Sequence, residues 1–373
     1  ILIHLNYLLM RKYVKNRTSV VIPTYNEEKN ICNLIKEIET VFNNKDYEIF
    51  IVDDGSTDKT IENIFNNYSK NKNIRVIQRE HDRGLVQSIK FALQSITGEY
   101  FVVMDGDGQH SANDIEKLLS NLSNNDLVVG VRDLNNLTQV SNIRSFFSKM
   151  FNKIIKLLLS VNISDPLTGF FSGRTSLLNP KFFLLSNSGF KVLLDLIFCS
   201  RKNEIKISEN QINFKERFSG SSKLTSQVMF SFVTQMLSYL FNGLISSKFI
   251  GFCLIGGFGF FIHFSIFLIL LNIFNLHFLL SHLIATLCGA TFNFIANNYL
   301  NFFNSRIDSP KKFIISILKY YLINSPGLAT SLGAANMVFN LITNNAIFAS
   351  LSGVIIDTIF KYFVSRTWIW KIN

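Results

Sequence analysis

The sequence is poor in cysteine, and the four cysteines that it has lie far apart. Cys32, Cys199, Cys253 and Cys288 include no closely spaced pair, so we expect neither a disulfide framework nor a cysteine-based zinc site. This usage suits a protein whose soluble part lies in a reducing compartment.

Acidic residues are also scarce, because 26 Asp and Glu stand against 37 Lys and Arg, for a formal net charge of +11. From Lys248 onward there are eight basic residues and two acidic ones, and the basic residues flank apolar runs. This placement predicts an anionic membrane surface and anionic substrates as partners, and no nucleic acid.

A cleavable leader is not expected at the amino end. Residues 1–17 are partly apolar but too short to cross a bilayer, and the small residues of a cleavage site are absent. We interpret residues 1–17 as an N-terminal tail close to the membrane.

The next part of the chain alternates short apolar runs with amphipathic segments. Strands are predicted at 19–23, 47–56, 74–78, 100–104 and 126–132, and helices at 27–42, 58–68, 84–98 and 112–123. This alternation predicts an α/β domain with a mostly parallel sheet covered on both faces. Ligands of such sheets bind beyond the carboxyl ends of the strands.

Acidic pairs stand at two of these strand ends. The run "YFVVM" ends in Asp105 and Asp107, and "YEIFIV" ends in Asp53 and Asp54. Asp105 and Asp107, with Gln109 two residues further on, supply hard oxygen ligands of the kind that Mg²⁺ or Mn²⁺ takes beside a substrate phosphate. A solvated turn is the simpler alternative, because Asp and Gly are common turn residues.

The motifs "VVIPTYNEEKNI", "FIVDDGSTDKT" and "VVMDGDGQH" occur in this order, and together they resemble family 2 glycosyltransferases of the GT-A fold. Within that family the chain is most similar to dolichyl-phosphate (polyprenyl-phosphate) mannose synthases. The stretches "HDRGLVQSIKFAL", "GVRD", "DPLTGFFSGR", "GFKVLLDLI" and "FKERFSGSSKL" extend the resemblance over about residues 18–224. A Rossmann-like GT-A catalytic domain is therefore expected there.

The resemblance implies a role for each matched position. Nucleotide-sugar binding falls on Pro23, Tyr25, Glu27, Ile51, Asp53, Asp105, Gly106, Asp107, Gln109, Arg132, Arg217 and Lys223. Within this set Asp105, Asp107 and Gln109 would hold the metal and the diphosphate, while Asp107, Arg132, Arg217 and Lys223 would be catalytic. Arg144 and Ser148, four residues apart on one helix face, would bind the acceptor phosphate.

The chain departs from the family at Gly106, Gly108 and Asp195. Gly106 and Gly108 replace residues of the usual "DADLQH", so we expect a looser metal-binding loop. Asp195 stands where the family has glutamate, and its role is left open. Gly220 is a predicted hinge of the loop that carries Arg217 and Lys223.

No histidine in these motifs is a persuasive general base, and the chemistry implied by the resemblance does not need one. His110 adjoins the metal motif and is expected to support it. A phosphate monoester has a second pKa of about 6, so a lipid phosphate is largely ionised at pH 7. The resemblance therefore implies inverting transfer of mannose from GDP-mannose to a dolichyl or polyprenyl phosphate, with Mg²⁺ or Mn²⁺ as cofactor. The nucleotide motifs do not encode the sugar, which leaves UDP-glucose open.

The rest of the chain is strongly apolar. Residues 225–247 are predicted to form amphipathic helices along the bilayer interface. Residues 248–373 contain four predicted spans, at about 249–271, 276–298, 313–335 and 345–365. The segments "KFIGFCLIGGFGFFIHF", "ATFNFIANNYLNFF" and "YFVSRTWIW" resemble the GtrA-like membrane domain.

The loops at one end of these spans lack Lys and Arg, whereas Lys248, Arg306, Lys311, Arg366 and Lys371 fall at the other end. The positive-inside rule then predicts an integral membrane protein with its catalytic domain in the cytoplasm. The composition, rich in Asn, Ile and Lys, favours the cell membrane of a prokaryote. A second class of function stays open, in which the spans flip a lipid-linked sugar that the soluble domain loads. A processive polysaccharide synthase is disfavoured, because no "Q-x-x-R-W" segment occurs.

Overall fold

A computed structural model describes residues 13–79, 84–132, 142–159, 161, 163–185, 191–201, 205–213, 226–324, 337–338, 342 and 346–371, without the side chains of 142–149, 151, 278–279, 282, 346–354 and 357. The chain divides into two units. The first comprises Ile1–Lys223 with Tyr239–Gly243, and the second Leu224–Ser238 with Leu244–Asn373.

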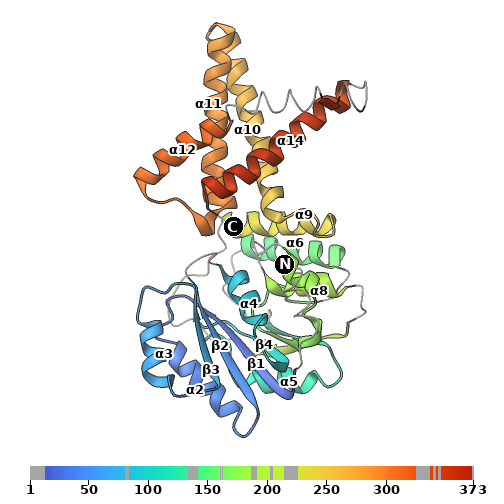
Figure 1. Cartoon of the computed structure of the whole chain (residues 1–373). Coiled ribbons are helices and arrows are strands. Elements are labelled where there is room, and N and C mark those ends of the chain that lie inside the picture. The colour runs from blue at the N-terminus through green and yellow to red at the C-terminus, as the bar shows by residue number, and fades with distance from the viewer. Residues whose placement is uncertain are drawn as a thin grey trace. The chain divides into compact units, whose positions relative to one another are not determined.

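The first unit contains a seven-stranded sheet in the order β3-β2-β1-β4-β6-β5-β7 (Figure 1). Its strands are β1 (Val14–Thr24), β2 (Tyr47–Asp53), β3 (Ile74–Gln78), β4 (Gly98–Val103), β5 (Leu127–Arg132), β6 (Phe171–Arg174) and β7 (Ile207–Ile212). β6 runs antiparallel to β4 and β5, and the other pairings are parallel. The prediction of a mostly parallel sheet is confirmed, while β6 and β7 were not predicted.

Helices cover both faces of this sheet. They are α2 (Ile31–Val41), α3 (Thr60–Tyr68), α4 (Leu85–Leu93), α5 (Asp114–Asn121), α6 (Asn142–Leu159), α7 (Pro180–Leu184) and α8 (Val192–Ser200). Alternate strand residues such as Val20, Ile22 and Ile51 pack with α2, α3 and α5 in one core cluster, as the two-residue period of a strand requires. On the other face α4 contacts β1 and β2.

The first strand begins earlier than predicted. Val14 pairs with Gly98 of β4, and the register shifts before Thr18. Asn16 adopts a positive φ of 62° within the shift, and its backbone N–H donates to Glu99 at 2.9 Å. The residues from Val14 onward therefore belong to the sheet, although the composition of 1–17 indicated a tail.

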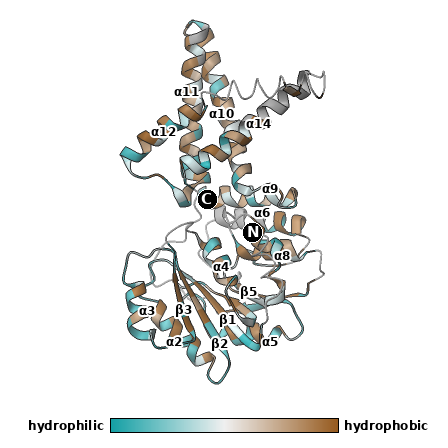
Figure 2. Cartoon of the chain, viewed as in Figure 1, coloured by the Kyte–Doolittle hydropathy of each residue, from teal (hydrophilic) through white to brown (hydrophobic). Residues whose placement is uncertain are grey.

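The second unit is helical, and hydrophobic residues recur along its helices (Figure 2). It contains α10 (Ser247–Asn272), α11 (Phe278–Ala296), α12 (Pro310–Asn324) and α14 (Ala346–Trp368), and α9 (Ser226–Leu240) joins it to the first unit. Phenylalanines such as Phe258, Phe260 and Phe261 are more than 60% exposed on α10. An apolar surface of this kind is typical of helices that face lipid.

Within the described residues, α10 is the helix that has the length and mean hydropathy, 2.3, of a membrane span. α11 and α14 begin and end close to the predicted spans 276–298 and 345–365, and the described part of α12 is 15 residues long. Residues 325–335 of the predicted third span lie outside the described residues.

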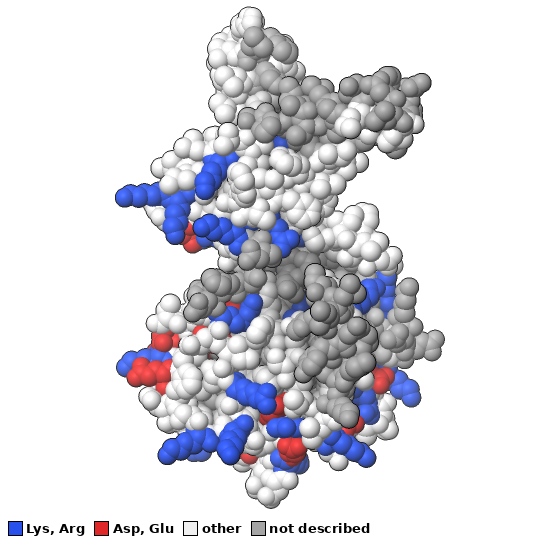
Figure 3. Space-filling view, in the orientation of Figure 1, with Lys and Arg blue, Asp and Glu red and all other residues white. Residues whose placement is uncertain are grey.

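Asparagine and aromatic side chains hold one end of the helical unit together. α11 continues into a π-helical turn, Asn297–Asn301, where Asn298 Oδ1 accepts from Trp370 Nε1 at 3.1 Å and from the Ile307 N–H at 3.0 Å. Asn301 donates to the Lys248 carbonyl at 2.9 Å. Lys and Arg side chains gather toward this end (Figure 3). The basic residues that flank the apolar helices therefore share one end of the unit.

Candidate active site

Three loops carry the sequence motifs, and they leave adjacent strands of the sheet. β1 pairs in parallel with β2 on one side, where Thr24 is opposite Asp53, and with β4 on the other, where Val21 is opposite Val103. The Met104 N–H donates to the Val21 carbonyl at 3.1 Å and extends this pairing to the end of β4. The carboxyl ends of β2, β1 and β4 therefore open side by side, as parallel strands require.

A cleft of about 410 Å³ lies at these strand ends. It is lined by Pro23, Thr24, Tyr25, Glu27, Asp54, Leu85, Ser88, Asp105, Gly106, Asp107 and Lys191. Six of the predicted nucleotide-sugar residues are in this list. Of the other predicted residues that the structure describes, Ile51 is buried in the sheet core and Asp53, Gln109 and Arg132 are outside the lining.

Glycines let the Asp105 loop approach its neighbours. A Cβ at Gly169 would lie 2.5 Å from Asp105 Oδ2, and a Cβ at Gly106 would lie 3.0 Å from Thr24 Cγ2. Gly108 has a φ of +74°, which L side chains rarely adopt. Gly106 and Gly169 thus allow close packing around the loop, and Gly169 makes room for the first carboxylate. The expected looseness of the metal-binding loop stays a prediction.

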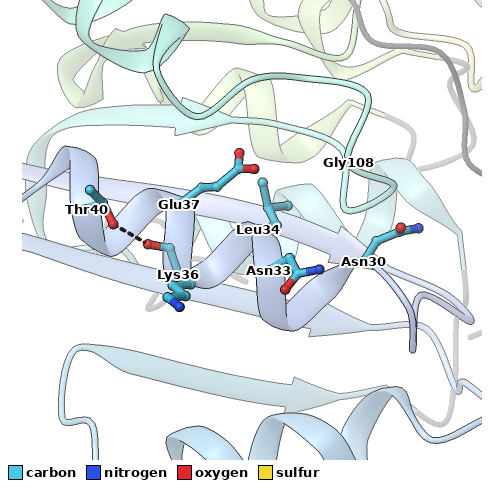
Figure 4. Close-up of a pocket in the computed structure, with 7 residues that line it drawn as sticks. All are labelled: Asn30, Asn33, Leu34, Lys36, Glu37, Thr40 and Gly108. Carbon is cyan, nitrogen blue, oxygen red and sulfur yellow. Dashed lines mark hydrogen bonds between the residues drawn. The ribbon is translucent and has the colours of Figure 1, made fainter.

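A second cavity, of about 610 Å³, lies between α2 and Gly108 (Figure 4). A Cβ at Gly108 would meet only Asn30 there, at 3.9 Å. Asn30 in turn donates to Glu27 Oε2 at 2.9 Å. The choice of residue at position 108 is therefore restricted by the backbone conformation and not by the space around it. Asn30 connects this side of the loop to Glu27, which lines the cleft.

His110 lies beneath the acidic loop and supports it. Its ring stacks on Phe170 with centroids 4.9 Å apart, and its Nδ1 accepts from the Asp105 N–H at 3.3 Å. Burial lowers the pKa of His110, and the nearby Asp105 and Asp107 carboxylates only partly oppose this. A neutral ring whose Nδ1 accepts a hydrogen bond fits a supporting role better than that of a general base.

The two aspartates at the end of β2 have different surroundings. Asp53 is 1% exposed and accepts from the Gly55 and Ser56 N–H groups at 3.0 and 2.8 Å, so its carboxylate organises the turn. Asp54 lines the cleft, where it accepts from Ser88 Oγ at 2.8 Å and pairs with Arg79 at 3.3 Å. The predicted contact of Asp53 with the nucleotide stays a prediction, and Asp54 is the acid that faces the cleft.

Arg132 ends β5 and is held by a residue of a second motif. Its Nε lies 2.8 Å from Asp165 Oδ2, and the Asp165 side chain is 7% exposed. Asp165 begins "DPLTGFF", the segment that also supplies Gly169 and Phe170. One segment thus orients Arg132, accommodates Asp105 and stacks on His110.

The remaining predicted site residues are not placed by the structure. Arg217, Gly220 and Lys223 lie outside the described residues. Arg144 and Ser148 lie on α6, as their spacing on one helix required, but their side chains are not described. Their roles stay predictions.

Leu85, Ser88 and Lys191 line the cleft and were not predicted as site residues. They belong to "HDRGLVQSIKFAL" and "GFKVLLDLI", two stretches that resemble the family but whose members were given no role. Their place in those stretches was the one signal that the sequence offered.

The donor set fits a divalent metal that shares its site with a substrate. Asp105 and Asp107 both line the cleft, and Gln109 follows in the same loop. Among the described residues, no group of three or more His, Cys, Asp or Glu side chains is arranged to hold a metal alone. Mg²⁺ usually takes one or two carboxylates and completes its shell with water and phosphate oxygens, so two carboxylates and an amide suffice.

Two family models match the chain. Residues 19–180 match glycosyl transferase family 2, and residues 251–370 match the GtrA/DPMS transmembrane domain. The protein therefore has a glycosyltransferase domain of family 2. That domain is followed by a membrane domain of the GtrA/DPMS type, which agrees with the apolar surface of the second unit.

Three curated relatives each match more than half of the chain. The dolichol-phosphate mannosyltransferase of Pyrococcus furiosus is 32% identical over 224 residues, which are 58% of this chain and 62% of that protein. Proteins of the same name from Mycosarcoma maydis and Saccharomyces cerevisiae are 28% and 27% identical and are covered to 77% and 85%. The chain thus spans less than two thirds of the archaeal relative.

Among solved structures, glucosyl-3-phosphoglycerate synthase from Mycobacterium tuberculosis, in complex with Mn²⁺, UDP-glucose and phosphoglyceric acid, is similar with a TM-score of 0.46. It is 17% identical, and the match covers 63% of this chain and 82% of that one. This likeness is too distant to indicate an activity.

Proposed function

We propose that this protein transfers mannose from GDP-mannose to a dolichyl or polyprenyl phosphate, with inversion at the anomeric carbon, at the cytoplasmic face of a membrane. The observation that carries the proposal is the cleft, which is lined by Asp105 and Asp107 from the loop after β4 and by Pro23 and Tyr25 from the end of β1 and the loop after it. The names of the three relatives favour mannose and dolichyl phosphate, and the GtrA/DPMS domain favours an acceptor in a membrane.

The proposed reaction forms one bond and breaks one. An oxygen of the acceptor phosphate attacks C1 of the sugar, and the bond from C1 to the nucleoside diphosphate breaks. The acceptor phosphate is largely ionised at pH 7, because its second pKa is about 6. No residue has to remove a proton, which agrees with the buried, supporting place of His110.

In the proposed reaction the protein holds the donor diphosphate and the acceptor phosphate close together and excludes water from them. Pro23 and Tyr25 would contact the nucleoside, since they border the cleft beside the acidic loop. Asp105, Asp107 and Gln109 would hold Mg²⁺ or Mn²⁺, which when bound neutralises charge on the departing diphosphate. Arg132, Arg144, Arg217 and Lys223 would offset the repulsion between donor and acceptor phosphates.

Membrane anchoring has a simple physical advantage for this reaction. The acceptor phosphate lies at the bilayer surface, so a tethered domain meets it at a high effective concentration. The four-span arrangement and the cytoplasmic placement of the catalytic domain are parts of the proposal, supported by the GtrA/DPMS match and by the basic end of the helical unit.

The test is a donor and acceptor panel with the full chain in membranes. Labelled GDP-mannose and UDP-glucose are each supplied with dolichyl phosphate, with dolichol, or with no lipid. The proposal predicts a labelled lipid from GDP-mannose only when the phosphate is present. Label from UDP-glucose alone would overturn the choice of sugar, and no labelled lipid from either donor would overturn the function.

A further inference from the structure

Lys191 has a distinctive place in the cleft. It immediately precedes α8 and lines the same space as Asp105 and Asp107. Among the described residues of the lining, four are acidic and Lys191 alone is cationic. A sugar diphosphate or a lipid phosphate entering this space adds negative charge, so a cation at this position would stabilise it.

The helix that follows Lys191 is fixed by a buried charge network. Asp195, one turn further along, has an Oδ2 that lies 2.7 Å from Lys90 Nζ, and both side chains are 3% exposed. The Tyr239 hydroxyl donates to Asp195 Oδ1 at 2.7 Å, and the Tyr239 ring stacks on Phe198 with centroids 4.3 Å apart. A buried ion pair that loses a partner is strongly destabilised, so this network holds α8 in one position.

The partner of Asp195 belongs to the other helix that borders the cleft. Lys90 lies on α4, whose first turns supply Leu85 and Ser88 to the lining. Lys90 Nζ also lies 3.4 Å from the Leu185 carbonyl oxygen and 5.0 Å from the centroid of the Phe182 ring. The ion pair therefore sets the distance between α4 and the start of α8, and with it the position of Lys191.

We propose that Lys191 binds a phosphate group in the active site, and that Asp195 and Tyr239 are positioning residues that act through Lys191. The inference rests on the proposed function and adds to it a cation that none of the assigned roles includes. The phosphate belongs either to the donor diphosphate or to the acceptor, and both present the same anionic oxygens to an ammonium group. The proposal gives a role to Asp195, for which the sequence alone indicated none.

The first test compares Lys191→Met and Lys191→Arg with Lys45→Met in the full chain. Lys45 is exposed, precedes the amino end of β2 and pairs with the exposed Glu116, so it is the matched control. We expect Lys191→Met to lower kcat/KM about 100-fold, Lys191→Arg to recover most of that loss, and Lys45→Met to match the parent. Equal kcat/KM for Lys191→Met and the parent would overturn the proposal.

Two readouts distinguish the source of the phosphate. A contact with the donor predicts weaker binding of GDP in the presence of Mg²⁺ by Lys191→Met. A contact with the acceptor predicts unchanged GDP binding and a raised KM for dolichyl phosphate. If the parent makes no labelled lipid, the proposed function has failed, and unchanged GDP binding by Lys191→Met would then overturn the inference as well.

The positioning role is tested with Tyr239→Phe, which removes one hydroxyl. We expect this change to lower kcat/KM about 3-fold to 10-fold in the parent and to have no further effect in Lys191→Met, because residues that act as a unit are not additive. A purely structural role predicts the same factor in both backgrounds, and that result would overturn the positioning role.

Discussion

At the scale of single residues, the site depends on how closely the backbone approaches one carboxylate. Asp105 reaches into the cleft past Gly169, where a Cβ would lie 2.5 Å from its Oδ2. The Asp105 N–H is directed to His110, and His110 is held by Phe170. Two consecutive residues, Gly169 and Phe170, therefore help to fix the acid that is proposed to bind the metal.

Gly169→Ala should disable the enzyme without unfolding it. The added methyl group has to displace the Asp105 carboxylate, and a displacement of about 1 Å can cost 100-fold in rate. We expect kcat to fall about 100-fold, with a far-ultraviolet circular dichroism spectrum like that of the parent. Gly256→Ala, where a Cβ meets nothing within 4 Å, is the control and should keep full activity. Activity of Gly169→Ala close to that of the control would contradict this account of the loop.

The acids at the strand ends were predictable because parallel strands end at one edge of a sheet. Which of Asp53 and Asp54 faces the cleft was not predictable. Adjacent side chains point in different directions, and the Asp53 carboxylate accepts hydrogen bonds from the turn after β2. Lys191 was not predictable as a cleft residue, because it is 84 positions from Asp107 in the sequence and reaches the cleft only through the packing of α8 on α4.

At the scale of elements, β6 is the strand that departs from the simple alternation. It is inserted antiparallel between β4 and β5, and the segment before it carries Asp165 and Gly169. The four-residue run "FSGR" is too short and too mixed in polarity to predict a strand. Its insertion nevertheless brings Asp165 to Arg132 across the carboxyl end of the sheet.

Asp165→Asn should weaken catalysis by releasing Arg132, whose Nε it holds at 2.8 Å. We expect kcat/KM to fall about tenfold or more, because a displaced cation binds phosphate less well. Asp126→Asn is the matched control, since Asp126 precedes the amino end of β5 and accepts from the Lys206 N–H at 2.9 Å. Steady-state kinetics of both variants decide the question: equal loss in the two would mean that Asp165 has only a structural role.

A cluster of asparagine and aromatic side chains, which includes Asn298, Asn301 and Trp370, joins the helices of the second unit. Asn298→Ala should leave the Trp370 and Ile307 N–H groups without their acceptor, at a cost of about 1–3 kcal/mol for a buried polar group. Thermal unfolding of the detergent-solubilised chain should show a lower midpoint than the parent. Asn304→Ala, at an exposed position, should leave the midpoint unchanged, and an equal midpoint for Asn298→Ala would contradict the role of the cluster.

At the scale of the whole molecule, an α/β unit and an apolar helical unit share one chain. Composition changes sharply near Lys248 and predicted a membrane domain from there, whereas the second unit already begins at Leu224. The sequence did not predict the π-helical turn at Asn297–Asn301. Two of the groups that contact this turn, the Lys248 carbonyl and the Trp370 indole N–H, are 53 and 72 positions away from their partners in the sequence.

Charge predicts the orientation of the chain in the membrane. Lys248, Arg306, Lys311 and Lys312 flank the ends of helices in the second unit, and the short turn between α10 and α11 has no Lys or Arg. A reporter fused after residue 373 should therefore be active only if it functions in the cytoplasm. A cysteine introduced at Asn275, in that turn, should react with an impermeant maleimide added outside intact cells, whereas labelling only after lysis would contradict the orientation.

The most direct measurement of the central claim is metal-dependent transfer of labelled mannose to dolichyl phosphate by the full chain, by Asp107→Ala and by Asp46→Ala. Asp46, at the amino end of β2, is the control carboxylate. The account predicts that EDTA stops product formation by the parent and by Asp46→Ala, that Mn²⁺ or Mg²⁺ restores it, and that Asp107→Ala stays inactive at every metal concentration. Product from Asp107→Ala at the parent rate, or transfer that persists in EDTA, would contradict it.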